Sequence, residues 1–193
     1  MRKIFHCGRF KLDLAKKTHI MGILNITDDS FSDGGLFLDK KKALRHAVKM
    51  SQEGADIIDV GAESTRPGSR AVPASVQIRR LLPVLKVLVK ELDKPISVDT
   101  SSLEVAKACI EEGATIINDI TGLKKFPKKA NLIARYGLGL VLMHIKGTPF
   151  NMQKNPVYKD VIDEIISSLR QSITIARKCG VRNNSCLLYT SDA

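Results

Sequence analysis

The sequence has little of what several common protein classes need. Among its 193 residues there is no tryptophan, and aromatic residues make up only 5%. Nucleic-acid-binding surfaces interleave exposed aromatics with basic residues, so this scarcity argues against such a partner despite a formal charge of +11. No apolar run approaches the roughly 18 residues of a membrane-spanning helix. The basic residues 1–17 contain no apolar stretch of signal-peptide length, and a cytoplasmic location is therefore expected.

Sequence patterns for metal binding and for disulfides are missing as well. The four cysteines form no C-x-x-C pair, and the four histidines show no H-E-x-x-H spacing. We expect free thiols rather than a zinc site or a disulfide framework. Basic runs at 40–42, 79–80, 124–125 and 128–129 are interpreted as solvated faces. A phosphate-bearing small substrate stays open as an anionic partner.

Short apolar runs rich in isoleucine and valine recur along the chain, and each ends in polar residues. They span residues 19–27, 55–61, 95–100, 114–120 and 139–147. The runs are too continuous for half-exposed strands and are typical of strands buried on both faces of a parallel sheet. Segments of helical periodicity separate them, which predicts parallel pairing with right-handed crossovers.

The clearest helical segment is the last one, because its apolar residues follow i, i+3, i+4 spacing and form one stripe. The stripe consists of Ile162, Ile165, Ile166, Leu169, Ile173 and Ala176. Residues 3–14 alternate imperfectly around a Cys-Gly-Arg turn, which predicts an N-terminal β-hairpin covering the bottom of the domain.

Two architectures fit this alternation: an open doubly wound sheet and a (β/α)₈ barrel. The glycine-rich first turn of a dinucleotide-binding fold is absent. Polar residues instead lie at or near the carboxyl ends of the strands, namely Asn25, Asp59, Asp99, Asn118 and His144. Those ends converge on one face of a barrel, so we predict an α/β fold of the TIM-barrel class. A full barrel needs about 250 residues, and we expect an incomplete one of about five to six βα units.

Two loops carry residues suited to a phosphorylated substrate. After the first strand, oxygen-bearing side chains follow in quick succession up to Gly34-Gly35, and hard oxygen ligands suit Mg²⁺. The alternative is a Ser/Asp-rich turn with a helix N-cap. After the second strand, Arg66 stands beside hydroxyls and before Pro67-Gly68, which suits bidentate binding of a diphosphate. The alternative there is a surface loop with an incidental arginine.

Asp99 and Asn118 end neighbouring predicted strands. An acid and an amide together can bind the donor–acceptor edge of a heterocycle, and buried groups of this kind normally have a partner or a ligand. An aspartate at a strand end can instead cap a helix. Met143 could line an apolar slot for a flat ring, although core packing is the alternative for a single Met or His.

Taken together, these segments resemble the dihydropteroate synthase family over residues 18–181. Met21–Gly35 is similar to the first-loop signature of that family, and Glu63–Gly68 resembles its second loop. Three further segments occur in the order and approximate spacing of the family: Val98–Thr100, Ile117–Asp119 and Met143–Pro149. Five motifs in order make coincidence implausible.

The resemblance implies an enzyme that joins 4-aminobenzoate to 6-hydroxymethyl-7,8-dihydropterin diphosphate, with Mg²⁺ as cofactor and a homodimer in the full-length form. By resemblance, Asn25 and Asp33 would hold Mg²⁺ against the diphosphate. Thr65 and Arg66 would engage the diphosphate. Arg66 also belongs to the expected catalytic set, with Asn25, Asp33 and Asp99.

The resemblance also assigns the binding of the two ring systems. Asp99 and Asn118 would contact the pterin, with Met143 in its pocket wall. Phe31 and Pro67 would shape the aminobenzoate site.

The chain departs from the family pattern at two places. Asp28 stands where the family usually has proline, which puts the efficiency of the first loop in doubt. Residues 182–193 lack the expected D-P-G-x-G-F strand end, although Leu187 and Leu188 could extend a sixth strand by composition. We therefore predict a partial pterin-binding barrel domain at 1–181 and an atypical, non-native tail at 182–193, in a truncated and inactive chain.

Two other functions compete with the synthase. One is a pterin-binding domain that transfers methyl groups from a methylated folate to a corrinoid protein, and the other is a non-catalytic fragment. The loops Ser30–Gly35 and Ser64–Gly68 argue against the methyltransferase, because by resemblance they serve a diphosphate and an aminobenzoate.

Overall fold

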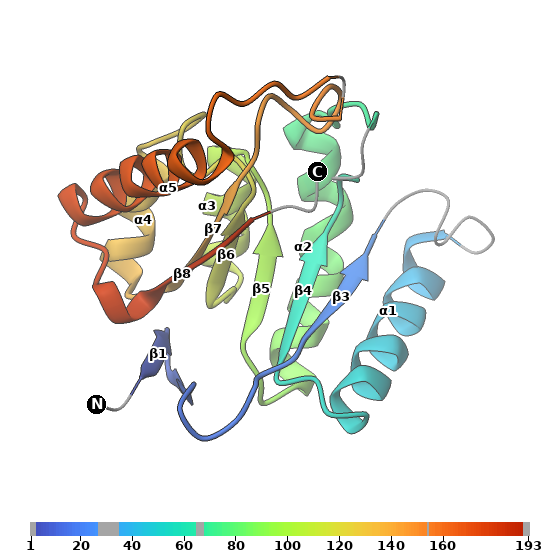
Figure 1. Cartoon of the computed structure of the whole chain (residues 1–193). Coiled ribbons are helices and arrows are strands. Elements are labelled where there is room, and N and C mark those ends of the chain that lie inside the picture. The colour runs from blue at the N-terminus through green and yellow to red at the C-terminus, as the bar shows by residue number, and fades with distance from the viewer. Residues whose placement is uncertain (1–2, 27–34, 65–67, 154, 191–193) are drawn as a thin grey trace.

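The computed structural model describes residues 3–26, 35–64, 68–153 and 155–190. Within them, six parallel strands form a curved sheet with helices around its outer side (Figure 1). The strands are β3 (Met21–Asn25), β4 (Ile57–Gly61), β5 (Ile96–Asp99), β6 (Ile116–Asp119), β7 (Gly139–His144) and β8 (Cys186–Thr190). The helices are α1 (Gly35–Gln52), α2 (Ala74–Glu91), α3 (Leu103–Glu111), α4 (Lys129–Tyr136) and α5 (Val161–Lys178).

The order of the strands decides between the two predicted architectures. It runs β3-β4-β5-β6-β7-β8, so each strand pairs with its predecessor in the chain. A doubly wound sheet reverses its order at a switch point, whereas a (β/α) barrel keeps it sequential. The predicted barrel class is confirmed, with five β-strands at the expected places and β8 as the sixth.

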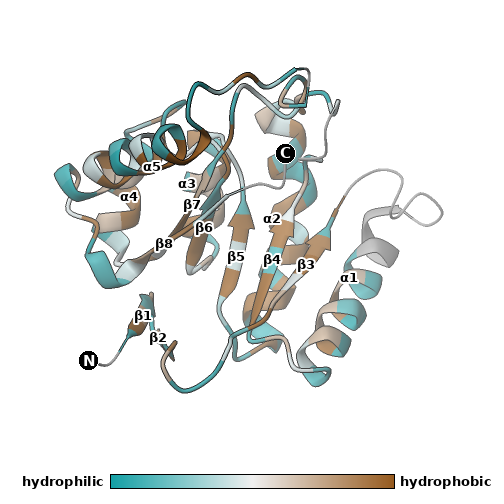
Figure 2. Ribbon diagram, viewed as in Figure 1, coloured by the Kyte–Doolittle hydropathy of each residue, from teal (hydrophilic) through white to brown (hydrophobic). Residues whose placement is uncertain are grey.

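The burial of the strands explains why their sequences are so continuously apolar. Every residue of β4, β6 and β7 is buried, because helices cover one face and the interior of the sheet covers the other. The edge strands β3 and β8 are much more exposed, and Ile23 is 63% exposed. In Figure 2 the apolar colour is concentrated on the strands and on the helix faces turned toward them.

The predicted N-terminal hairpin is confirmed as β1 (Ile4–Cys7) paired antiparallel with β2 (Phe10–Asp13). Phe5 and Cys7 pack against residues at the amino-terminal ends of the strands, among them Ile57 and Ile116. Gly139, at the start of β7, permits this approach: a Cβ there would lie 2.7 Å from Phe5 Cζ and 2.8 Å from Cys7 Cβ. The hairpin therefore closes the bottom of the sheet.

The apolar stripe of α5 is helical as predicted but only partly buried. Ser172 and Ala176 are the buried residues that define its inner face, whereas Ile162 is 64% and Ile166 is 41% exposed. The helix packs on β7 and α4. Among the described residues, none of the helices combines the length and hydropathy needed to cross a bilayer.

Part of the predicted tail forms the strand β8. Its residues pair in parallel with β7, from Leu140 opposite Cys186 to His144 opposite Thr190. The possibility that Leu187 and Leu188 extend a sixth strand is confirmed. The prediction that residues 182–193 are an atypical tail concerns their origin, which strand pairing does not test.

Candidate active site

Three of the predicted site residues lie on one row of the sheet. The register places Asn25 opposite Gly61, Gly61 opposite Asp99, and Asp99 opposite Asn118. Side chains alternate between the two faces along each strand, so Asp59, two residues before Gly61, lies on the same face one step lower. The sheet therefore brings three strand ends with acid and amide side chains together at its carboxyl edge.

Asp59 and Asn118 form a buried pair inside this group. Asn118 Nδ2 donates to Asp59 Oδ2 at 3.2 Å, and Asn118 is 6% and Asp59 4% exposed. Asp59 Oδ1 has no hydrogen-bond partner among the described residues. Burial raises the pKa of Asp59, and the nearby Ser97 hydroxyl and Asn118 amide offset part of this effect. A buried acceptor without a donor favours a ligand that carries N–H groups.

Asp99 lies in an environment that disfavours its charge. Burial raises its pKa well above the usual value, and the nearby carboxylates of Asp59, Asp119 and Glu63 raise it further. Lys129 acts in the opposite direction. Several carboxylates close together at strand ends are typical of functional sites, because their mutual repulsion is unfavourable for folding.

Asn25 supports the predicted cation site only in part. It ends β3 with an exposed side chain, and an added Cβ at Gly61 would lie 3.6 Å from Asn25 Oδ1 and 3.7 Å from Asp99 Cβ. Its amide oxygen is thus a hard donor at the mouth, the type of ligand that Mg²⁺ takes. The second expected ligand, Asp33, lies outside the described residues, as does Phe31. Among the described residues, no cluster of three His, Cys, Asp or Glu side chains could hold a metal.

The predicted residues Thr65, Arg66 and Pro67 also lie outside the described part of the chain, but both flanks of their loop are anchored. Glu63 accepts from the Val72 amide at 3.0 Å and from Gln77 Nε2 at 3.1 Å. These contacts fix the two sides of the loop at the carboxyl edge of the sheet.

Backbone contacts anchor the same loop closer to its tip. Ser69 Oγ donates to the Ser64 carbonyl at 2.6 Å, and the Gly68 amide donates to the Pro149 carbonyl at 2.8 Å. The second contact ties this loop to the connection between β7 and α5.

Met143 and His144 end β7 in different roles. Met143 is 8% exposed. It lies on the same face of β7 as Val141, the residue paired with Asn118, and is two residues closer to the carboxyl end of the strand. His144 is 8% exposed and hydrogen-bonds Ser168 Oγ through Nδ1 at 2.9 Å. Burial lowers the pKa of His144, and the nearby Lys124 and Lys146 lower it further. A packed, hydrogen-bonded histidine matches the core-packing alternative for this residue.

Two residues near the site were not predicted from the sequence. Tyr189 of β8 donates from its hydroxyl to Asn118 Oδ1 at 3.3 Å, although it belongs to the segment interpreted as a tail. Lys129 is 0% exposed, so the interpretation of residues 128–129 as a solvated face is wrong for it and right for Lys128. The helix α4 begins at Lys129 and turns this side chain inward, a detail that two adjacent lysines do not reveal.

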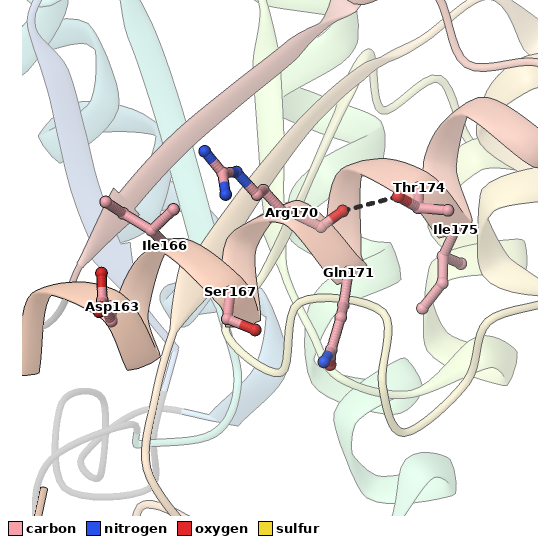
Figure 3. Close-up of a pocket in the computed structure, with 7 residues that line it drawn as sticks. All are labelled: Asp163, Ile166, Ser167, Arg170, Gln171, Thr174 and Ile175. Carbon is pink, nitrogen blue, oxygen red and sulfur yellow. Dashed lines mark hydrogen bonds between the residues drawn. The ribbon is translucent and has the colours of Figure 1, made fainter. Parts of the chain in front are cut away.

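A hollow lies elsewhere, along the flank of α5 (Figure 3). It measures about 750 Å³, and its lining residues are Asp163, Ile166, Ser167, Arg170, Gln171, Thr174 and Ile175. All of them belong to one helix, and the Thr174 hydroxyl bonds the Arg170 carbonyl of the same helix at 2.8 Å. Binding sites of α/β barrels are built from several strand ends, so the carboxyl edge of the sheet is the better candidate.

Comparison with known proteins identifies the relatives of this chain. It is 41% identical to the dihydropteroate synthase of Clostridium beijerinckii over 94% of its own length and 65% of the relative. It spans 63–65% of the length of the first curated relatives that it matches.

Solved structures with a similar fold include two dihydropteroate synthases with bound ligands. The dihydropteroate synthase of Xanthomonas albilineans with 4-aminobenzoic acid shares 37% identity at a TM-score of 0.86, over 97% of this chain and 66% of that one. The enzyme of Burkholderia cenocepacia complexed with 7,8-dihydropteroate shares 34% at 0.82, over 96% and 62%.

A family model described as pterin binding enzyme matches residues 21–189, which include β3 to β7, most of β8 and the acid–amide group at the carboxyl edge of the sheet. The chain therefore belongs to the pterin-binding enzyme family.

Proposed function

We propose that this protein is a dihydropteroate synthase of folate biosynthesis, which condenses 4-aminobenzoate with 6-hydroxymethyl-7,8-dihydropterin diphosphate. The observation that carries the proposal is the acid–amide group of Asp59, Asp99 and Asn118 at neighbouring strand ends. Solved relatives with 4-aminobenzoic acid and with 7,8-dihydropteroate support both the acceptor and the product.

The hydrogen bond between Asp59 and Asn118 determines what the amide offers to a ligand. Asn118 donates one Nδ2 hydrogen to Asp59, and its Oδ1 accepts from Tyr189, so a second acceptor position on Oδ1 remains for a ligand. Asp59 Oδ1 and the carboxyl group of Asp99 supply further acceptors. An aminopyrimidinone ring carries a row of N–H donors along one edge, and this set of acceptors complements that edge. Met143 supplies an apolar wall to the same pocket.

The reaction needs charge stabilisation rather than a nucleophilic side chain. The C–O bond to the diphosphate breaks with its electron pair leaving on the diphosphate, and the pterin ring stabilises the methylene cation. The aminobenzoate nitrogen then forms the new C–N bond and releases a proton. Carboxylates around the pterin favour the cationic state, so Asp59 and Asp99 would act through their field.

The departing diphosphate requires groups at the mouth of the sheet. We propose that Asn25 and Asp33 hold Mg²⁺ there, with Thr65 and Arg66 on the diphosphate and Phe31 and Pro67 around the aminobenzoate. The metal would neutralise charge on the leaving group. The exposed amide of Asn25 beside Gly61 supports this arrangement. A cytoplasmic location and a homodimeric full-length form belong to the same proposal.

Pterin binding is the direct test of this assignment. The chain is titrated with 6-hydroxymethylpterin, and the change in the fluorescence of the ligand is measured. Asn118→Ala is expected to weaken binding at least tenfold, because the ligand loses its hydrogen bond to the buried amide oxygen of Asn118. Asn131→Ala, an exposed asparagine on α4, serves as the matched control and should bind as the wild type does. Wild-type protein that binds no pterin would contradict the proposal.

Catalysis is tested separately by measuring diphosphate release from the dihydropterin diphosphate with and without 4-aminobenzoate. A synthase releases diphosphate and forms 7,8-dihydropteroate in equal amounts, and EDTA should suppress both products. Methyl transfer from a methylated folate to a corrinoid protein, without any dihydropteroate, would favour the competing methyltransferase function instead.

A further inference from the structure

The helix α4 begins with a lysine that has no access to solvent. Lys129 is 0% exposed, and its Nζ lies 2.9 Å from Asp119 Oδ2 and 2.9 Å from the Thr100 carbonyl oxygen. A cation is disfavoured both by burial and by the amino-terminal end of a helix. Its neighbour Lys128 is exposed, so a solvated lysine is available one position away.

The two partners of Lys129 directly follow the two residues proposed to bind the pterin. Thr100 follows Asp99 at the end of β5, and Asp119 follows Asn118 at the end of β6. The Thr100 amide also donates to the Asn118 carbonyl at 3.0 Å. One ammonium group therefore bridges the ends of both strands from behind the pocket.

Asp119 also hydrogen-bonds the turn between β6 and α4, which connects Lys129 to the conformation of that turn. Its Oδ1 accepts from the Thr121 amide at 2.9 Å and from the Thr121 hydroxyl at 2.7 Å, and its Oδ2 accepts from the Leu123 amide at 3.1 Å. Leu123 has a φ of 65°, a conformation that a leucine adopts only when its surroundings impose it. Without the ammonium, Asp119 would be a buried charge with no counter-ion among these contacts.

We infer that Lys129 is a positioning residue that fixes the separation of Asp99 and Asn118 for pterin binding without touching the pterin. This inference rests on the proposed function, because it assigns Asp99 and Asn118 to the pterin. Lys129 also offsets the negative charge that Asp59, Asp119 and Glu63 place around Asp99. The bridge and the charge act together to hold acidic groups close to one another at the pocket.

Three variants of the chain test the bridge. Lys129→Met keeps a buried unbranched stem and removes the ammonium, Lys129→Arg keeps the charge, and Lys128→Met removes a charge at the exposed neighbour. We expect the dissociation constant for 6-hydroxymethylpterin to rise at least tenfold in Lys129→Met. In Lys129→Arg it should be at least threefold lower than in Lys129→Met. In Lys128→Met it should stay within twofold of the wild-type value. A purely structural lysine would lower the melting temperature and leave the affinity of the folded fraction unchanged, which overturns the inference.

Folding is measured for each variant by circular dichroism before the titration. If Lys129→Met does not fold, the double variant Lys129→Met with Asp119→Asn removes both buried charges and is titrated in its place. It still lacks the bridge to Thr100, so the same tenfold loss is expected, and wild-type affinity overturns the inference.

Amide hydrogen exchange separates a failure of this inference from a failure of the proposed function. The amides of Thr100, Thr121 and Leu123 should exchange at least tenfold faster in Lys129→Met, or in the double variant, than in Lys128→Met. If the wild type binds no pterin, the proposed function fails and the positioning role fails with it, whatever the exchange rates. If the wild type binds pterin and exchange at these amides is unchanged, the bridge is overturned alone.

Discussion

The two ends of the parallel sheet differ in the side chains that they bury: apolar groups at one end and carboxyl groups at the other. At the amino-terminal ends of the strands, which we call the sealed end, the hairpin packs Phe5 and Cys7 against apolar side chains. At the carboxyl ends, which we call the open end, burial raises the pKa of both Asp59 and Asp99, and the charge of Asp59 raises the pKa of Asp99 further. Burial of apolar area stabilises the sealed end, whereas the open end holds charges that only a ligand or a counter-ion relieves. Stability and chemistry are therefore concentrated at different ends of the same strands.

The largest expected effect removes the apolar seal. Phe5→Ala takes away a ring that is 1% exposed, and we expect a loss of about 3–5 kcal/mol in the free energy of unfolding. Urea denaturation measures it, and Phe126→Ala, a partly exposed phenylalanine at 38%, should change it by only about 0.5 kcal/mol. Equal losses in the two variants would show that the hairpin does not seal the sheet.

The same substitution placed at each end sharpens the contrast. Gly139→Ala puts a Cβ 2.7 Å from Phe5 Cζ, and we expect it to cost about 1–3 kcal/mol. Gly61→Ala puts a Cβ at 3.6 Å or more from its neighbours, so it should leave stability nearly unchanged and instead weaken binding at the mouth beside Asn25 and Asp99. Loss of stability at Gly61 without any effect on ligand binding would remove the distinction between the ends.

Neutralising an acid at the open end should stabilise the protein. Asp99→Asn removes a charge that burial and neighbouring carboxylates disfavour, and we expect a gain of about 1 kcal/mol in the free energy of unfolding together with weaker pterin binding. Thermal denaturation and ligand titration measure the two effects. A variant that is both less stable and unimpaired in binding would contradict the proposed role of Asp99.

The dependence on pH follows from the direction of the pKa shift. Folding raises the pKa of Asp99 above its ordinary value of 3.8. The folded protein therefore binds this proton more tightly than the unfolded chain does. The resulting stabilisation is fully present below pH 3.8 and is lost as the pH rises through the pKa of the folded state. Asp99→Asn should therefore gain most over the wild type at neutral pH and least near pH 4. Denaturation midpoints of both proteins across this range check the sign, and a gain that grows on acidification would refute it.

The smallest effect concerns Tyr189. Tyr189→Phe removes the hydroxyl that bonds Asn118 Oδ1 at 3.3 Å and leaves this acceptor free for a ligand. We expect affinity for 6-hydroxymethylpterin to rise by up to about threefold, since one neutral hydrogen bond contributes about 1 kcal/mol or less. Weaker binding would instead show that the tyrosine helps to hold the pterin.

The sequence was sufficient for features that depend on neighbouring residues in the chain. Continuous runs such as Ile57–Gly61 predicted strands buried on both faces, and the polar residue at each strand end predicted the open end. These signals are local because they are carried by consecutive residues of a single strand and by the polar residue that ends it. The hairpin around Cys7–Phe10 was equally local.

Features that depend on contacts across the fold were not accessible in this way. Asp59 and Asn118 are 59 residues apart, and only the register of β4, β5 and β6 brings them together. The two lysines at 128 and 129 differ by one position on a helix, and only the helix start decides which of them is buried. The exposure of Ile162 depends on what lies beside α5, which its own periodicity does not specify.

The contact between Gly68 and Pro149 joins two connections through backbone atoms alone. Side-chain replacements at Pro149 leave its carbonyl acceptor in place, whereas at Gly68 the φ of 81° disfavours every residue with a side chain, and proline would also lack the N–H. The junction should therefore tolerate substitution at 149 but not at 68, and it should not tolerate a change in loop length. Insertions and deletions between 64 and 72, together with substitutions at 68, are the changes that would uncouple the two connections.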